Sequence, residues 1–439
     1  MNLADTVILP RWLVPVRPAG AILEDHAVVV ADGRISDLLP RDEALRRYQA
    51  HSRVELPSHV LIPGLINTHT HSPMSLLRGL ADDLPLMTWL KEHIWPAELQ
   101  WVSEDFVRDG TELAIAEMLR GGTTCFQDMY FFPEVSARVA ANAGIRACIG
   151  LILVDFPSAW ADGPEAYISK GLELHDAYRD SALITTAFAP HAPYTVSDEP
   201  LRRVADLAQE LDLAVHIHVH ESAEEVQQDV ARYGVRPLQR LADLGLVSHR
   251  LIAVHATQLL DGEIEALADA GSHVVRCPES NLKLASGFTP VARLLHAGVN
   301  VALGTDGAAS NNDLNMLGEM RTASLLQKGL TGDPTAGSAH SILEMATLNG
   351  ARALGLDRVV GSLEVGKAAD MAAVDLAQLE TQPLYNPVSQ LAYAADRHLV
   401  TDVWVAGRRL LNRRQLTTLD VDDILGRTRE WQRRIGPER

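Results

Sequence analysis

The chain has 439 residues, of which 47% are apolar and 22% are charged, as in an ordinary folded protein and unlike a disordered one. Its 57 acidic and 39 basic residues give a formal net charge of −18, and no basic block with interleaved aromatic residues occurs, so nucleic acid is not expected as a partner. No apolar run approaches the roughly 18 residues that a membrane span needs, and no early lysine or arginine marks a secretory leader.

The first 60 residues have the pattern of short strands. Residues 27–30 form a β-like run, and the Asp32-Gly33 pair that follows is typical of a hairpin turn.

The middle of the chain alternates apolar runs with segments long enough for one helix each. This β/α alternation favours parallel strands, and eight such runs favour a closed (β/α)₈ TIM barrel, an α/β fold, over residues 61–357. The expected strands are residues 61–66, 123–126, 147–154, 182–187, 214–219, 251–254, 273–275 and 301–304.

Strand-like material returns near the carboxyl terminus, at residues 371–374 and 400–405, again with Gly and Asp turns. The simplest interpretation is a small β-sandwich module that both chain termini form together. We expect this module to comprise residues 1–60 and 358–415, with a helix over residues 416–439.

Three cysteines bear on the cellular compartment. Cys125, Cys148 and Cys277 lie far apart and are odd in number, which argues against a disulfide framework. We therefore expect buried, reduced cysteines and a cytoplasmic protein. Oligomeric state is open, and a homo-oligomer is compatible with the sequence.

Polar residues follow most of the expected barrel strands, at the end where barrel enzymes place their catalytic groups. His69 and His71 come after the first strand, and side chains at i and i+2 leave the same face, so the two imidazoles converge. The others are His191 after the fourth strand, His218 and Glu221 after the fifth, His255 after the sixth and Asp306 after the eighth.

Several imidazoles and a carboxylate around one point match a catalytic zinc that keeps a position open for water, although such ligands also suit iron or manganese. A second, bridged metal is not expected, because the fourth strand ends in Ala189-Pro190-His191 and offers no lysine that could be carboxylated. We therefore expect one metal per chain.

The fifth strand leaves one choice open. His216, His218 and His220 alternate on the same face, and we prefer His218 as the ligand because it lies three residues before Glu221. Two rival zinc motifs are absent: position 224 is Glu where His-Glu-x-x-His needs histidine, and no Pro-Cys-x-x-Cys occurs.

Four motifs in order resemble the amidohydrolase superfamily: Pro-Gly-Leu-Ile-Asn-Thr-His-Thr-His, His-Val-His-Glu, Val-His-Ala and Gly-Thr-Asp-Gly, at residues 63–71, 218–221, 254–256 and 304–307. The resemblance covers nearly the whole chain. Residues 74–85, followed by Trp89 and Glu98, look like the subgroup that deaminates 5′-methylthioadenosine and S-adenosylhomocysteine.

The resemblance implies a role for each candidate. By it, His69, His71, His218 and Asp306 are metal ligands, Glu221, His255 and Asp306 are catalytic, and Trp89, Glu98 and His191 line a nucleoside pocket. A bound metal brings the acidity of water near neutrality for attack on carbon 6 of adenine. Glu221 would protonate ring nitrogen 1, Asp306 would pass the water proton to ammonia, and the product would be the inosine analogue.

Substrate choice within this chemistry rests on the pocket and not on the barrel. Subgroup members that favour S-adenosylhomocysteine are expected to place an arginine near the end of the third strand, where this chain reads Cys-Ile-Gly-Leu-Ile-Leu at residues 148–153; Arg146 lies towards the other end. We therefore expect a preference for methylthioadenosine or adenosine. Guanine, a pterin or a triazine is the alternative small-molecule substrate, and a non-enzymatic barrel scaffold is the alternative outside catalysis.

Overall fold

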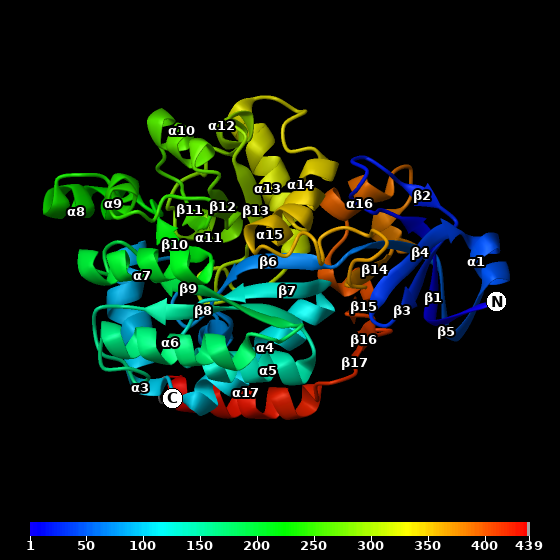
Figure 1. Cartoon of the computed structure of the whole chain (residues 1–439), viewed down its shortest axis with the longest axis horizontal. Coiled ribbons are helices and arrows are strands. Elements are labelled where there is room, and N and C mark those ends of the chain that lie inside the picture. Colours follow the sequence, from blue (N-terminus) through cyan, green and yellow to red (C-terminus); the bar gives the residue numbers. More distant parts are fainter. Residues whose placement is uncertain (437–439) are drawn as a thin grey trace. The chain divides into compact units, whose positions relative to one another are not determined.

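The computed structural model describes residues 1–436 and contains two sheets, one of eight strands and one of nine (Figure 1). The chain separates into two compact units. The first consists of residues 1–67, 116–125 and 315–419, and the second of residues 68–115, 126–314 and the segment from Asp420 onward. The domain boundaries expected from the sequence stay a prediction.

The eight-stranded sheet has its strands in chain order, and the neighbours from β8 to β13 pair in parallel. Between successive strands the chain forms helices, and α6 and α7 pack against β8 and β9. The strands are β6 (Leu65–Thr70), β7 (Thr123–Asp128), β8 (Arg146–Leu153), β9 (Ile184–Pro190), β10 (Val215–Val219), β11 (Leu251–His255), β12 (His273–Arg276) and β13 (Asn300–Leu303).

Helices follow these strands, as predicted for the connections between parallel strands, and two helices instead of one follow β10 and β12. They are α4 (Glu104–Arg120), α5 (Pro133–Ala143), α6 (Pro164–Tyr178), α7 (Asp198–Leu211), α8 (Ala223–Tyr233), α9 (Pro237–Asp243), α10 (Asp261–Asp269), α11 (Pro278–Lys283), α12 (Val291–His296) and α13 (Met316–Thr331). Shorter elements follow β6: η1 (Ser72–Leu77), α2 (Leu86–Thr88), η2 (Trp89–Ile94) and α3 (Trp95–Trp101).

The carboxyl ends of the first and last strands of this sheet meet. The Asp306 backbone N–H donates to the His69 carbonyl at 3.0 Å, and the Thr68 hydroxyl donates to the Leu303 carbonyl at 2.5 Å. Gly304 permits this approach, because a Cβ there would lie 2.7 Å from the His69 nitrogen. The expected α/β barrel of TIM type is therefore confirmed, and its closure brings Asp306 beside His69.

The first barrel strand differs from the expectation of residues 61–66. Residues 60–63 belong to the end of β5 (Tyr48–Pro63) in the other sheet, and β6 begins at Leu65. Gly64 separates the two strands, and a Cβ at this position would lie 2.0 Å from the Thr124 hydroxyl oxygen. The prediction was wrong because one continuous apolar run serves two buried strands, and hydrophobicity alone gives no boundary between them.

The nine-stranded sheet is built from both ends of the chain, as predicted. Its order is β17-β16-β15-β14-β5-β1-β3-β4, with β2 paired to β1; the β1–β5 pair is parallel and its other pairs are antiparallel. Its remaining strands are β1 (Asn2–Leu13), β2 (Leu23–Glu24), β3 (His26–Ala31), β4 (Arg34–Pro40), β14 (Met371–Asp375), β15 (Val400–Val405), β16 (Arg408–Asn412) and β17 (Gln415–Leu416).

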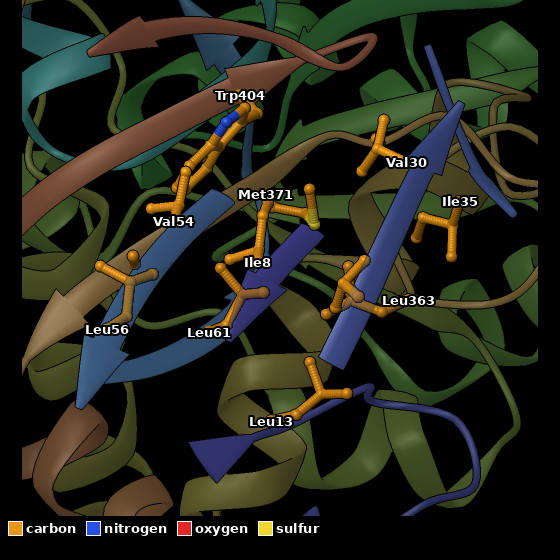
Figure 2. Close-up of a cluster of buried hydrophobic side chains, with 13 residues drawn as sticks. Ile8, Leu13, Val30, Ile35, Val54, Leu56, Leu61, Leu363, Met371 and Trp404 are labelled. Atoms are coloured by element: carbon orange, nitrogen blue, oxygen red, sulfur yellow. The ribbon is translucent and has the colours of Figure 1, made fainter. Parts of the chain in front are cut away.

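A buried apolar cluster joins the two ends of the chain within this unit. Ile8 and Leu61 from the amino-terminal part pack with Met371 and Trp404 from the carboxyl-terminal part (Figure 2). Burying each such side chain contributes roughly 1.5–3 kcal/mol, so the cluster explains why the distant segments form one sheet. The unit's short helices are α1 (Arg41–Arg47), α14 (Ala339–Met345), α15 (Leu348–Ala353), α16 (Pro387–Tyr393), η3 (Leu379–Thr381) and η4 (Arg397–Leu399).

The carboxyl-terminal helix α17 (Val421–Ile435) lies within the range 416–439 expected to be helical, of which residues 437–439 are outside the described residues. It is anchored to α4 by the buried Asp109 carboxylate, which accepts a hydrogen bond from Trp431 Nε1 at 2.8 Å and pairs with Arg427. The same helix contacts η1, the segment directly after His71. This contact supports the loop that carries one of the candidate ligands.

The cysteines and the helices bear on two further expectations. Cys125, Cys148 and Cys277 are all buried thiols outside any disulfide, as expected. Among residues 1–436, every helix is too short or too polar to cross a membrane.

Candidate functional site

Three candidate ligands meet where the barrel closes. His69 ends β6, His71 follows it, and Asp306 lies just after β13. The Nε2 atoms of both histidines are 3.3 Å from Asp306 Oδ1. The i, i+2 spacing and the hydrogen bond between the first and last strand ends therefore bring two imidazoles and one carboxylate to a common point.

Two further histidines enter the same cluster from β10 and β11. His218 Nε2 is 3.1 Å from His69 Nε2, and the rings of His218 and His255 stack with centroids 5.4 Å apart. Two overlapping sets of three residues could each hold a metal ion, because within each set the ligand nitrogen and oxygen atoms, one per residue, lie within 4.8 Å of one another. These sets are His69, His218 and His255, and His69, His71 and Asp306.

Unusual backbone conformations aim some of these side chains. His255 has φ of 70° and Asp306 has φ of 67°, both in the left-handed region that residues other than glycine seldom adopt. Such strain persists only where the surrounding structure imposes it, and it concentrates at functional sites. Both residues stand at the carboxyl ends of barrel strands, which is the end where the cluster forms.

The outer nitrogens of the candidate ligands are fixed by the protein. His71 Nδ1 donates to the Met129 carbonyl at 2.6 Å, and His218 Nδ1 donates to the His191 carbonyl at 2.7 Å. A carbonyl only accepts, so in each ring Nδ1 carries the hydrogen and Nε2 presents a lone pair to the cluster. Ser280 and Ser310 hydroxyls donate to Asp306 Oδ2, which leaves Oδ1 facing the imidazoles.

The charges in the cluster also suit a divalent cation. Burial lowers the pKa of His69 and lowers the pKa of His218 well below 6.5, so the imidazoles are neutral donors near pH 7. Burial alone would raise the pKa of Asp306, but the hydrogen bond from His69 and the nearby imidazoles hold it well below its usual value. Neutral imidazoles and an ionised carboxylate are the forms that bind zinc, so the donor set fits a metal ion.

Glu221 lies beside the cluster, at the end of β10. It is buried, its Oε1 is 3.8 Å from His255 Nε2, and burial together with Asp306 and Glu225 raises its pKa well above 4.5. These surroundings favour the protonated form of the carboxyl group, which is the form that a general acid needs.

A residue without an assigned role in the sequence analysis, Glu225, positions this acid. Its carboxylate accepts hydrogen bonds from the backbone N–H groups of Glu221 at 2.6 Å and His220 at 2.9 Å, and it forms a capping box with Ser222 at the start of α8. The Ser-x-x-Glu pattern predicts the start of a helix, but it does not indicate that Glu225 contacts the backbone of Glu221.

The cluster forms the floor of a cavity of about 400 Å³ that also contains all three predicted substrate contacts. Trp89 comes from η2, Glu98 from α3 and His191 follows β9. The Glu98 side chain lies within the cavity, where burial raises its pKa to about 6 and the nearby Tyr130 hydroxyl opposes the shift. All the predicted catalytic, metal and substrate residues except the fully buried His69 therefore line one cavity, and Tyr130 is a further lining residue for which no sequence signal exists.

Most of the remaining wall is apolar. It consists of Leu86, Leu90, Ile94, Trp95, Phe131, Ile152, Val154 and Phe156, together with further residues of the same segments. No lysine or arginine of the described residues lines this cavity. Arg146 lies at the opposite end of β8 from Ile152, and its guanidinium donates to the Ala182 carbonyl.

The three alternating histidines of β10 have three different environments. His218 lies in the cluster; His216 Nε2 is 2.9 Å from His69 Nδ1; and His220 Nε2 accepts a hydrogen bond from the Leu238 N–H at 3.1 Å. A positive φ of 54° at His220 turns the chain at the strand end. The structure thus distinguishes the environments of these three histidines, which strand periodicity alone does not.

A (β/α)₈ barrel with a cluster of imidazoles and a carboxylate at the strand ends defines a metal-dependent hydrolase class of site. The model of the amidohydrolase family matches residues 60–410, and the chain belongs to this family.

Relatives of known name and structure resemble the chain over nearly its whole length. It is 53% identical over 436 residues to a 5-methylthioadenosine/S-adenosylhomocysteine deaminase of Saccharophagus degradans, covering 99% of this chain and 98% of the relative. It is 52% identical to a protein of the same name from Teredinibacter turnerae, covering 98% and 97%. A crystal structure of an adenosine deaminase from Xanthomonas campestris with bound zinc superposes with a TM-score of 0.98 at 54% identity, covering 99% of each chain.

Proposed function

We propose that this protein is a zinc-dependent aminohydrolase that converts 5′-methylthioadenosine and water into the inosine analogue and ammonia. One observation carries the proposal: the predicted nucleoside contacts Trp89, Glu98 and His191 line a single cavity together with members of the buried imidazole–carboxylate cluster, namely His71, His218, His255 and Asp306. The relatives named as deaminases at 53% and 52% identity support the same reaction.

His69, His71, His218 and Asp306 would hold the metal, which we infer to be zinc because the similar adenosine deaminase structure contains it. Iron or manganese would suit the same donors. When bound, the ion supplies Lewis-acid activation that brings the pKa of water near 7.

The surrounding residues supply the proton transfers. Glu221, protonated through burial, gives its proton to ring nitrogen 1 and so makes carbon 6 electrophilic. Asp306, ionised through its imidazole neighbours, accepts one proton of the attacking water and delivers it to the departing amino group, and the other water proton restores the acid form of Glu221 as the carbonyl at carbon 6 forms. His255 Nε2 has no protein hydrogen-bond partner among the described residues, so it is free to orient the water.

The cavity wall would recognise the nucleoside. An ionised Glu98 accepts two hydrogen bonds from the vicinal ribose hydroxyls, Trp89 covers the apolar part of the substrate and His191, just after β9, contacts the nucleoside from the same end of the barrel. Burial lowers the pKa of His191 to about 3, so this imidazole is uncharged. Buried cysteines that take part in no disulfide support a cytoplasmic location for this small-molecule enzyme.

We predict one tightly bound divalent metal per chain, because the described residues form a single imidazole–carboxylate cluster. Elemental analysis of purified protein should give a molar ratio near one, with zinc as the leading metal. Two metals per chain, or active protein without any, would contradict this prediction.

We also predict that 5′-methylthioadenosine is preferred over S-adenosylhomocysteine. The apolar residues Ile152, Val154 and Phe156 suit a methylthio group, whereas a zwitterionic amino-acid tail loses hydration there and meets no lining lysine or arginine. Ammonia release from adenosine, methylthioadenosine, S-adenosylhomocysteine, adenine and guanine at one pH measures the kcat/KM ranking.

The same measurement tests the proposed function. Faster deamination of guanine than of any adenine nucleoside would overturn the reaction assigned here. A higher kcat/KM for S-adenosylhomocysteine would overturn only the tail preference.

A further inference from the structure

His216 is a fully buried histidine of β10 that the reaction itself does not use. Its Nε2 lies 2.9 Å from His69 Nδ1, and the two rings meet edge to edge, with centroids 5.1 Å apart and an interplanar angle of 26°. The contact therefore combines a hydrogen bond with a fixed ring orientation.

His69 differs in this respect from the other two histidine ligands proposed above. His71 and His218 each donate Nδ1–H to a backbone carbonyl, which holds the ring without any dependence on side-chain identity. His69 Nδ1 instead meets a side chain, so its orientation depends on which residue occupies position 216.

The positions of the hydrogens follow from this geometry. If His69 binds metal through Nε2, its hydrogen is on Nδ1, and His216 Nε2 must be the acceptor. His216 then carries its own hydrogen on Nδ1, which is buried and has no hydrogen-bond partner in the described structure. Burying an unpaired donor costs free energy, so an apolar residue would be the better choice here unless the Nε2 contact matters.

We propose that His216 is a positioning residue that fixes the tautomer and ring plane of His69 and thereby strengthens metal binding. This inference rests on the metal site proposed above. Outer partners of metal-binding histidines commonly change metal affinity by about 10–100-fold when they are replaced.

The chain offers a matched control on the same strand. His220 is also fully buried, but its Nε2 accepts from the Leu238 N–H and it does not contact the cluster residues by hydrogen bonds. Loss of packing or of a buried imidazole in β10 should affect His216 and His220 variants alike, whereas loss of metal retention should follow His216 alone.

Three substitutions separate the hydrogen bond from the ring. His216→Phe keeps an aromatic ring at this position without an acceptor, His216→Asn is polar but too short to reach His69, and His216→Gln places a carbonyl oxygen near the position of Nε2. The measurement is the rate at which zinc-loaded protein releases zinc to excess chelator, with circular dichroism and Tm as checks of folding. His220→Gln is measured in parallel.

We expect zinc release to be at least about tenfold faster in His216→Phe and His216→Asn, and close to the wild-type rate in His216→Gln and His220→Gln. Wild-type rates in folded His216→Phe and His216→Asn, or a fast rate in His220→Gln, would overturn the proposal. Wild-type protein that binds no zinc would overturn the metal site itself.

A second measurement needs no variant. In zinc-loaded protein with ¹⁵N-labelled histidine, the His216 ring should be the neutral tautomer with hydrogen on Nδ1 and a bare Nε2. A hydrogen on His216 Nε2 would overturn the proposal even if the substituted proteins failed to fold.

Discussion

Replacing Glu221 with glutamine is expected to leave the metal bound and to lower kcat by about a hundredfold or more. Glutamine keeps the shape of the side chain and donates a hydrogen bond, but it has no acidic proton to transfer. Burial raises the pKa of the Glu221 carboxyl well above 4.5, which favours the protonated form that the reaction needs. Metal content and kcat, measured on the same preparation, separate the two effects.

Glu224 gives the matched control for this substitution. It lies three residues further along, is exposed, and accepts a hydrogen bond from Gln228 outside the cavity at 2.9 Å. Glu224→Gln should therefore retain wild-type kcat. If Glu221→Gln also retains it, the general acid is another group, and Glu225 becomes the residue to test. Its pKa, raised by burial to about 7, would permit that role.

The contacts of Glu225 explain why the position of Glu221 could be predicted only in part from the sequence. The strand pattern places Glu221 just past a strand end, and the capping-box sequence predicts a helix start at Ser222. The Glu225 carboxylate accepts hydrogen bonds from the backbone N–H groups of both His220 and Glu221 because the chain makes a left-handed turn at His220. No local sequence pattern predicts this turn. A loop conformation of this kind is decided by tertiary contacts.

The barrel was predictable because its two signals are strong. Helix-length segments between apolar runs require parallel strands, and parallel strands carry their terminal residues to one edge, so the predicted residues meet in one cavity. The boundary at Gly64 was not predictable, because β5 and β6 are both apolar and only a backbone approach to Thr124 separates them. Periodicity likewise gives His216, His218 and His220 the same face and no further distinction.

Some partners of the site have no sequence signal at all. Ser280 and Ser310 orient the Asp306 carboxylate through 2.7 and 2.8 Å hydrogen bonds; Ser280 lies in α11 and Ser310 in the turn after β13. Serine is common in turns and at helix ends for local reasons, so its presence there does not reveal a distant carboxylate partner. These contacts depend on how the barrel closes, which only the three-dimensional structure gives.

The second large effect is expected at Glu98, where replacement by alanine should lower kcat/KM for nucleosides by about a hundredfold while changing the rate with free adenine little. Hydrogen bonds to a charged group contribute about 1.5–3 kcal/mol each, and a carboxylate that pairs both ribose hydroxyls makes two of them. Free adenine has no ribose, so it does not depend on this contact. The measurement is the ratio of the two kcat/KM values in wild-type and Glu98→Ala protein.

Glu92→Ala is the control, because Glu92 is an exposed acid on the neighbouring η2 and its replacement should leave the ratio unchanged.

A pH series tests the same Glu98–ribose contact independently. Burial raises the pKa of Glu98 to about 6, so the carboxylate that accepts both hydrogen bonds is present above that pH and is lost as the pH falls through it. The nucleoside-to-adenine ratio should therefore fall below about pH 6 in wild-type protein and stay flat in Glu98→Ala. Equal losses for nucleoside and adenine in Glu98→Ala would instead assign Glu98 to the support of α3.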